Sequence, residues 1–496
     1  MRAVRSVVPA LGCAPRPRMA RLHHVDPARA LVRAASAALL AAWLLAPGPA
    51  LAHEGSEEIE WSQFQGGPGH PGTILDAPTP PYRERWRFQP PSGGLSGAVL
   101  TGDLAVAVGR DAVYGVELGS GELAFQIPRR GGPLSTPALA RVGERLVLLY
   151  LEGPRSAAGG SPSPSPAAEA EGSRVSELVA VDLADRSELW RASLGATSRS
   201  GVSVAEGLAY VGDDLGGVSA FSVATGEPVW TAEAVGRVDA PPAVADGRVY
   251  VAARDLEQPR TQVLALDARS GERRWTFSPS GGAVVISGLS AGDGAVVLGA
   301  GDQLVRGLAA EDGSLRWHAL ALNLFSPVSA PAYQPGNVYI ADAAGGLYRL
   351  NPADGGVDWD HQTNALIVHS SPVVVGPYVV VGLGDGRLAA FEATSGDLVY
   401  ASAPSPGPLG PLALSHQLLV APTGGSRPAL VAYEHDPAGA LVRVASPTIP
   451  VPTRLVGWFA LAAAIVGVAI LVPFRLVAPR FGPAFTRDEE PVEAEP

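Results

Sequence analysis

A unit of about 42 residues recurs between Trp61 and Ser446, and this periodicity constrains the fold more than any other feature of the chain. The best copies place a Trp or Tyr four positions after a turn glycine. In five consecutive copies the glycines are Gly226, Gly271, Gly313, Gly355 and Gly396, spaced 45, 42, 42 and 41 residues apart. An alternating apolar segment such as 263–266 precedes each Asp-x-x-Ser/Thr-Gly turn, so the unit contains a β-hairpin.

The rest of each unit predicts two further strands. A small-residue and proline element such as Ser329-Ala330-Pro331 is followed by a short apolar strand such as 248–251, which a glycine turn opens. Four short antiparallel strands cannot bury both faces alone, but radially stacked units cover one another. Eight units therefore predict an all-β, eight-bladed β-propeller. Seven blades are the alternative if the degenerate first or last unit fails to pair.

The terminal units predict how the ring closes. The repeat region, 84–446, begins with half a unit at 85–88 and ends with a complementary hairpin at 430–444. Together the two halves make one blade, which leaves no open sheet edge. An insertion at 153–175 is rich in Ser, Pro, Ala and Glu, a composition that cannot build a core. Residues 53–83 form an extension ahead of the ring.

The two ends of the chain predict an envelope location. Residues 1–52 carry a basic stretch, an apolar run and Ala50-Leu51-Ala52, the pattern of a cleaved signal peptide, with Met1 or Met19 as the start. A membrane-spanning helix is the alternative interpretation of that run. Residues 454–475 are predicted to form a transmembrane helix, because 455–474 is an uncharged run of bilayer length bounded by Arg454 and Arg475.

Arginines are more frequent after that segment than before it. This bias predicts a single-pass membrane protein with a cytoplasmic tail at 476–496 and its propeller on the periplasmic or extracellular side. Residues 447–453 are predicted to form a stalk between the propeller and the membrane segment.

Charge excludes one class of partner. Removing residues 1–52 takes away seven Arg and one Asp, so the formal charge falls from −11 to −17. A surface this acidic repels nucleic acid. The single cysteine, Cys13, leaves with the signal peptide, so the mature protein has no disulfide.

The unit Ala-x-Asp-x-x-Thr/Ser-Gly-x-x-x-Trp, followed by Ser-Pro and Gly-x-Val-Tyr-Val elements, resembles the pyrroloquinoline quinone (PQQ)-type β-propeller repeat. The segment WSQFQGGPGH at 61–70 is similar to the stretch that precedes the first blade in many members. The resemblance covers about residues 60–446. It implies the fold strongly and the function weakly, because the family holds quinoprotein alcohol dehydrogenases and non-enzymatic envelope proteins.

Quinoprotein dehydrogenases of this family hold PQQ with a vicinal disulfide, a calcium site and a catalytic Asp. Here the disulfide is absent, and Asp267, Asp312 and Asp354 fall at turn positions that local hydrogen bonding explains. We therefore expect neither PQQ nor calcium, no metal site and no catalytic residue. The Trp residues are predicted to pack between blades. The Gly-x-Ser-x-Gly pattern at 288–292 lies at a strand-to-strand turn, not at the strand-to-helix elbow of a hydrolase.

Loops that join the outer strand of one blade to the inner strand of the next gather around the channel mouth. Their polar residues are the candidate binding residues Arg129, Arg130, Arg199, Arg237, Asp239, Asn323, Asn364 and His369. Arginines in an acidic domain suit an acidic peptide or another carboxylate. The alternative is an ordinary solvated rim.

Two functions follow from these observations. The first is a membrane-anchored, non-enzymatic propeller that binds protein or peptide partners at the cell envelope. The alternative is a PQQ-dependent dehydrogenase, or another small-ligand enzyme, with a degenerate site. Clustered Asp, Glu and Asn at the channel mouth favour the enzyme, whereas an apolar or arginine-lined groove favours the scaffold.

Overall fold

The computed structural model describes residues 59–153, 175–255, 257, 260–279, 288–320 and 329–442, all within the compact unit Gly55–Pro496. The predicted signal peptide (1–52), stalk (447–453), membrane segment (454–475) and tail (476–496) lie outside these residues. So does the insertion at 153–175, apart from its two end residues. Within the described ranges, no helix combines the length and apolar character that crossing a membrane requires.

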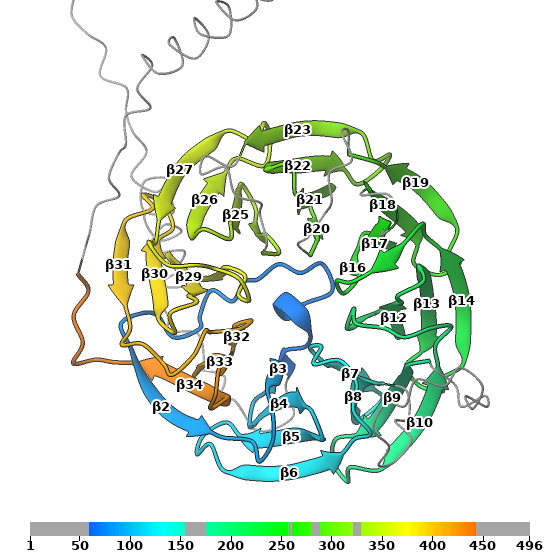
Figure 1. The fold of residues 1–496 in the computed structure, drawn as a ribbon, viewed down its shortest axis with the longest axis horizontal. Helices are drawn as coiled ribbons and strands as arrows, with labels where there is room; N and C mark the ends of the chain where they lie inside the picture. Colours follow the sequence, from blue (N-terminus) through cyan, green and yellow to red (C-terminus); the bar gives the residue numbers. More distant parts are fainter. Residues whose placement is uncertain are drawn as a thin grey trace, which may run out of the picture. The chain divides into compact units, whose positions relative to one another are not determined.

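Eight antiparallel sheets surround a central channel as the blades of a propeller (Figure 1). The eight-bladed prediction is confirmed. In each blade the innermost strand lies next to the channel and the outermost strand lies at the rim of the ring, and adjacent strands are antiparallel (Figure 1). The helix in the described part of the chain is the short 3-10 turn η1 (Phe64–Gly66).

Blades 1 to 4 follow the chain in order. Blade 1 contains β3 (Leu95–Thr101), β4 (Leu104–Gly109), β5 (Ala112–Glu117) and β6 (Leu123–Pro128); blade 2 contains β7 (Ala138–Val142), β8 (Arg145–Glu152), β9 (Glu177–Asp182) and β10 (Glu188–Ser193); blade 3 contains β11 (Val202–Ala205), β12 (Leu208–Gly212), β13 (Gly217–Ser222) and β14 (Pro228–Glu233); blade 4 contains β15 (Arg237–Val238), β16 (Ala243–Ala245), β17 (Arg248–Asp255), β18 (Arg260–Asp267) and β19 (Arg273–Phe277). In blade 4, β15 and β16 both pair with β17.

Blades 5 to 8 complete the ring. Blade 5 contains β20 (Ser290–Gly292), β21 (Ala295–Gly299), β22 (Leu304–Ala309) and β23 (Leu315–Leu320); blade 6 contains β24 (Ala332–Gln334), β25 (Asn337–Ala341), β26 (Gly346–Leu350) and β27 (Val357–Gln362); blade 7 contains β28 (Val373–Val375), β29 (Tyr378–Gly382), β30 (Leu388–Glu392) and β31 (Leu398–Ala401); blade 8 contains β32 (Ala413–Leu414), β33 (Leu419–Thr423), β34 (Ala429–His435) and β2 (Tyr82–Phe88).

Blade 8 closes the ring with strands from both ends of the chain. The outer strand β2 pairs with β34 in antiparallel register from Tyr82↔His435 to Phe88↔Leu430. The predicted closure between the two terminal half-units is therefore confirmed. The predicted hairpin at 430–444 is wrong in its second arm: β34 ends at His435, and β2 takes the outer position. The Val442 amide instead donates to the Val399 carbonyl, beside blade 7.

Tryptophans join neighbouring blades, as the sequence predicts. In six tryptophans, one in each of six blades, Nε1 donates to a carbonyl of the next blade, for example Trp230 to Ala268 at 2.9 Å. The indole lies against the turn glycine of that blade. A Cβ added at Gly271, where φ is +73°, would come within 2.6 Å of the Trp230 ring. The Gly and Trp of the repeat are therefore two sides of one contact between blades.

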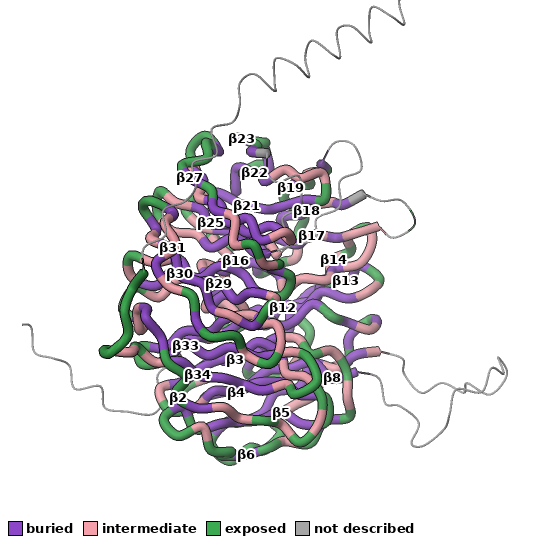
Figure 2. The backbone as a smooth tube through the Cα atoms, turned by 60° about the vertical axis from the view of Figure 1, so that its left-hand side comes forward, coloured by how far each residue is buried: buried purple, intermediate pink, exposed green. Residues whose placement is uncertain are grey.

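In four blades a serine at or just before the inner strand fastens it to the end of the second strand. Four serines accept a hydrogen bond from the backbone amide twelve residues later; the pairs are Ser96–Val108, Ser200–Gly212, Ser329–Ala341 and Ser370–Gly382. Because the buried amide needs a partner, this serine has a structural role, and Ser329 and Ser370 belong to the small-residue and proline element of the repeat. Figure 2 shows burial concentrated along the strands, with exposure at the loops.

The N-terminal extension enters the ring. Its first strand, β1 (Ile59–Trp61), pairs with β3 on the channel side of blade 1, and η1 lies at the centre of the channel (Figure 1). We call residues 60–74 the channel segment. It runs along the inner strands of blades 2 to 7 before the chain reaches β2.

Candidate binding site at the channel mouth

The mouth is built from the loops that connect blades and from the turns between second and third strands, which lie at the same end of the antiparallel blades. They enclose a hollow of about 450 Å³. Its lining residues are Phe64, Gly94–Gly97, Leu134, Ser135, Thr136, Arg199, Ser200, Pro241, His369, Pro408, Gly410, Pro411 and Pro422–Gly425. Phe64 comes from η1 at the ring centre, so the channel segment supplies the inner end of the hollow.

The walls of this hollow are apolar and hydroxyl-bearing. Leucine and proline side chains alternate with Ser and Thr, and Ser96 and Ser200 already accept backbone amides. Arg199 and His369 are its ionisable lining residues, and none of the described lining residues is a carboxylate. The hollow therefore suits a ligand in which an apolar group lies next to a negatively charged group.

Arg199 is the cation best placed to meet such a ligand. Its side chain is 61% exposed, and its Nε lies 3.6 Å from Asp214 Oδ2. The same arginine lines a second hollow of about 460 Å³, together with Gly132–Ser135, Gly153, Ser176, Thr197, Ser198 and Asp214. Leu134 and Ser135 also line both hollows, so the two hollows are neighbours.

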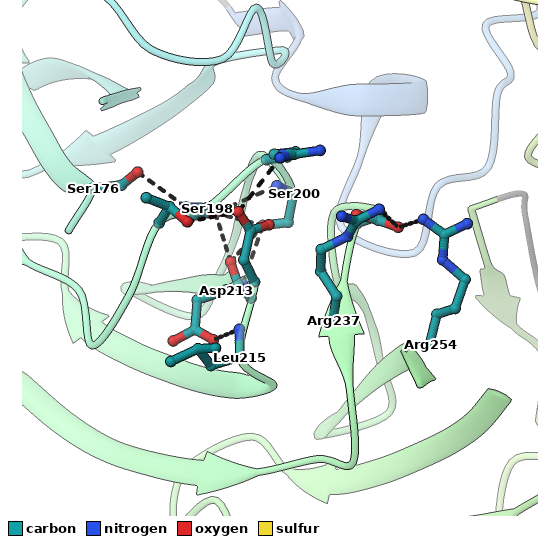
Figure 3. Close-up of polar contacts among 12 residues, drawn as sticks. Ser176, Ser198, Ser200, Asp213, Leu215, Arg237 and Arg254 are labelled. Carbon is teal, nitrogen blue, oxygen red and sulfur yellow. Dashed lines mark hydrogen bonds and ion pairs between the residues drawn. The ribbon is translucent and has the colours of Figure 1, made fainter. Parts of the chain in front are cut away.

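Serine hydroxyls fix the loop that carries Arg199 (Figure 3). The Ser198 hydroxyl donates to the Gly212 carbonyl at 2.6 Å, and the Ser198 amide donates to the Ser176 hydroxyl at 3.0 Å. Asp213 accepts the Leu215 and Gly217 amides at 2.9 and 2.7 Å, which holds the adjacent turn. Arg199 therefore projects from a braced loop, so little conformational entropy is lost when a ligand meets it.

Asp214 follows this turn and lies beside Arg199. Thr197 Oγ1 donates to Asp214 Oδ2 at 2.6 Å, whereas the buried Oδ1 atom has no hydrogen-bond partner among the described residues. A backbone or amine donor entering the second hollow could satisfy this oxygen.

Arg237 and Asp239 form a separate charged group. The Asp239 carboxylate lies between two guanidinium groups, with Arg254 Nη2 at 2.6 Å and Arg237 Nη2 at 3.2 Å from Oδ2 (Figure 3). The carboxylate is already paired, so this cluster braces β15 against β17.

Arg129 does not face the channel mouth as a ligand group. Its residue is 7% exposed, and its guanidinium donates to the carbonyls of Gly109 at 2.7 Å and Leu151 at 2.5 Å. Burial lowers the pKa of the Arg129 guanidinium. The sequence could not show this burial, because the carbonyls come from two different blades.

The four remaining candidates have four different outcomes. Arg130 is exposed but paired with Glu177 at 3.0 Å, so it helps close the base of the insertion. Asn364 is exposed with φ +57°, which marks it as a turn residue. His369 is exposed and lines the hollow. Asn323 lies outside the described residues.

The Gly-x-Ser-x-Gly pattern at 288–292 forms the inner strand β20. Ser290 is fully buried, and its hydroxyl donates to the carbonyls of His70 and Pro331. The serine thus holds the channel segment in place. This agrees with excluding a nucleophile elbow, since a nucleophile must be accessible.

The part that the channel segment takes in the site was missed in the sequence. The WSQFQGGPGH stretch signalled its presence, but nothing in the residue pattern indicated that Phe64 would reach the mouth. Its partners are single backbone groups scattered over the repeats, which leave no periodic signal.

The side chains near the mouth determine whether the calcium ion and the PQQ that some family members bind would fit here. Among the described residues no three His, Cys, Asp or Glu side chains are grouped to hold a metal ion. Calcium prefers six to eight oxygen ligands, usually including carboxylates, and the described lining of the main hollow supplies none. These residues do not fit a calcium-bound PQQ.

Comparison with known proteins places the chain. The profile of the PQQ-type repeat family described as "Outer membrane protein assembly factor BamB" matches residues 174–319 and 258–435, which together span just over half of the chain. The chain belongs to this family of PQQ-type β-propellers.

Two relatives illustrate the breadth of the family. The serine/threonine-protein kinase AfsK of Streptomyces griseus is 32% identical over 241 residues, which are 43% of this chain and 28% of the kinase. The chain therefore spans little more than a quarter of that relative. The outer membrane protein assembly factor BamB of Yersinia pestis is 24% identical over 318 residues, or 60% of this chain and 72% of BamB.

A solved structure shows that the same fold serves an enzyme. A europium-containing methanol dehydrogenase superposes with a TM-score of 0.60 at 11% identity, over 76% of this chain and 98% of the enzyme. At this identity the likeness concerns the fold alone. The function must therefore be argued from the site.

Proposed function

We propose that this protein is a membrane-anchored propeller that binds extended segments of partner proteins at its channel mouth. The observation that carries the proposal is the open hollow above Phe64, which combines apolar walls with one exposed arginine and no carboxylate among its described lining residues. Such a site would take an apolar side chain and pair a neighbouring carboxylate with Arg199. The similarity to an outer membrane assembly factor supports a binding role over catalysis.

Exposed apolar side chains extend this surface beyond the hollow. Leu215 is 78% exposed in the turn after Asp214, and Val235 lies in the neighbouring loop, because the Ala234 amide donates to the Gly216 carbonyl. Leu366 and Val368 are exposed in the loop that carries His369. Apolar residues at the rim of a polar loop surface are typical of a protein contact.

The test compares matched arginine variants of the purified protein. Short extended peptides with one central Leu and either a free carboxyl terminus or an amidated terminus are titrated by fluorescence anisotropy. We expect free-acid peptides to bind about tenfold more tightly, since one charge-assisted pair contributes about 1.5 kcal/mol. Arg199→Ala should remove that preference.

Arg269→Ala is the control, because Arg269 is also exposed and paired with one carboxylate, Glu206 at 3.0 Å. It lies in the turn between β18 and β19, at the other end of the blade. Equal affinities for acid and amide peptides in the unaltered protein would contradict the proposed role of Arg199.

The envelope location rests on the sequence of the two chain ends and is tested separately. Intact cells should expose the propeller to added protease while the segment after Arg475 stays protected. Protection of the propeller, or release of mature protein without residues 454–475, would contradict the single-pass arrangement.

A further inference from the structure

The inner strand of each blade has one edge that faces the channel and is not paired within its own sheet. Unpaired strand edges carry free N–H and C=O groups that bind an added chain. In this protein the added chain is the channel segment, residues 60–74. It contacts all eight blades: β1 pairs with β3 in blade 1, and the Glu60 carboxylate accepts the His416 amide of blade 8 at 2.8 Å.

Blades 2 to 7 each donate one inner-strand amide to the segment, at 2.6 to 2.8 Å. The donor and acceptor pairs are Leu139 to Ser62 O, Val204 to Gln63 Oε1, Val244 to Pro68 O, Ala291 to Gly69 O, Tyr333 to Pro71 O and Val374 to Gly72 O. Six equivalent amides in a ring thus bind one chain, which includes the 3-10 turn η1. The recognition is mainly through the backbone, which is the chemistry of a peptide site.

Side chains of the segment add specificity. Gln63 makes a two-way pair with β11, since its amide also donates to the Val204 carbonyl at 3.1 Å. His70 is completely buried, its Nδ1 lies 2.8 Å from the Leu289 carbonyl, and its ring meets Phe64 edge-on at 5.2 Å. A Cβ at Gly69 would lie 2.3 Å from the Ala291 carbonyl oxygen, so this position accepts only glycine.

We propose that the ring of inner strands is a peptide-binding site, that its ligand in this chain is the channel segment, and that the segment binds as a separable ligand. The site takes a Gly- and Pro-rich peptide that forms a turn at 64–66, with Gln at position 63, Gly at 69 and His at 70. Phe64 of the segment also lines the mouth hollow, but the proposal rests on the six inner-strand amides and does not depend on the function proposed at the mouth.

The linker after the segment makes the proposal testable on the intact chain. Leu75 is 64% exposed, so a site-specific protease sequence inserted between Leu75 and Asp76 is open to cleavage. The cut leaves β2 to β34 as one continuous chain. Size-exclusion chromatography then shows whether the cut segment stays with the ring, and a fluorescein-labelled synthetic peptide of residues 59–74 reports exchange by anisotropy.

The cut segment is expected to co-elute with the ring and to be replaced by the labelled peptide at one per ring. Uncut protein should bind the peptide at least about 100-fold more weakly, because its site is filled by a tethered copy. A competitor peptide with Gly69→Ala should be about 10- to 100-fold weaker than the native sequence, since overpacking against the Ala291 carbonyl is unfavourable.

The matched control peptide carries Gly67→Ala. Gly67 has an extended φ of −160°, and a Cβ there would meet Pro71 at an ordinary 3.5 Å. This peptide should compete like the native one.

Several results would overturn the proposal. They are dissociation of the cut segment with no peptide rebinding, equal binding to cut and uncut protein, and equal competition by the Gly69→Ala peptide. Loss of the native circular dichroism on cutting would also refute it, because the segment would then be an inseparable part of the ring.

Discussion

Replacing Gly271 by alanine tests the contact that joins the blades. Gly271 adopts φ +73°, and a Cβ would come 2.6 Å from Trp230 Cε3. The left-handed backbone costs an alanine about 1–2 kcal/mol. Displacing the indole costs about 1–3 kcal/mol more. The free energy of unfolding should therefore fall by about 2–5 kcal/mol, as the sum of these two effects.

The control for this substitution lies in the same blade. Gly247 adopts φ +69°, but a Cβ there would have no neighbour within 4 Å. Gly247→Ala should cost only the backbone contribution, about 1–2 kcal/mol. The difference between the two variants isolates the Trp230 contact and is read from urea midpoints at constant m-value.

The double variant Gly271→Ala with Trp230→Ala should be less destabilised than the sum of the two single changes, because the clash partner is gone. A Gly271→Ala variant no less stable than Gly247→Ala would refute the argument that the repeat glycine and tryptophan form one interblade contact.

Three further predictions concern buried charge and cofactor chemistry. Burial lowers the pKa of His70 from 6.5 to about 4. Between these two pH values the unfolded chain binds a proton that the folded chain does not, so the free energy of unfolding should fall by about 3 kcal/mol as the pH drops through this window. In His70→Gln the free energy of unfolding should depend less steeply on pH over the same window. Arg129→Ala should lower the free energy of unfolding by about 3 kcal/mol without changing peptide binding at the mouth, whereas Arg130→Ala should change it by less than about 1 kcal/mol; equal effects would contradict the assigned burial. Titration of PQQ with calcium should give no saturable quenching of tryptophan fluorescence and no dye-linked alcohol oxidation; one-to-one binding abolished by Asp239→Ala would favour the enzyme.

The sequence was sufficient for the blades because their determinants are local. The turn glycine with positive φ and the tryptophan four residues after it recur from repeat to repeat, so the number of blades and their closure could be predicted. The outer strand of the last blade could not be predicted, since any strand with unsatisfied backbone groups can pair with β34. The strand that does so is β2.

The candidate site was predicted less completely. Arg199 and His369 were found because they lie on loops that the repeat places at the mouth. Arg129 also lies on such a loop, but its side chain is buried because its guanidinium donates to backbone carbonyls of two blades. Phe64 was not identified because the channel segment is held by single backbone amides from successive blades. The residue types at these positions do not indicate such contacts.

The central claim is that partners dock at the channel mouth, and photo-crosslinking in intact cells tests it most directly. A photoreactive residue replaces Leu215 or Leu366 at the mouth, or Leu75 near the turn at Gly376, at the opposite end of the blades. Docking at the mouth should give discrete protein adducts from both mouth positions, reduced by the added Arg199→Ala change, and none from Leu75. Adducts confined to Leu75 would contradict it.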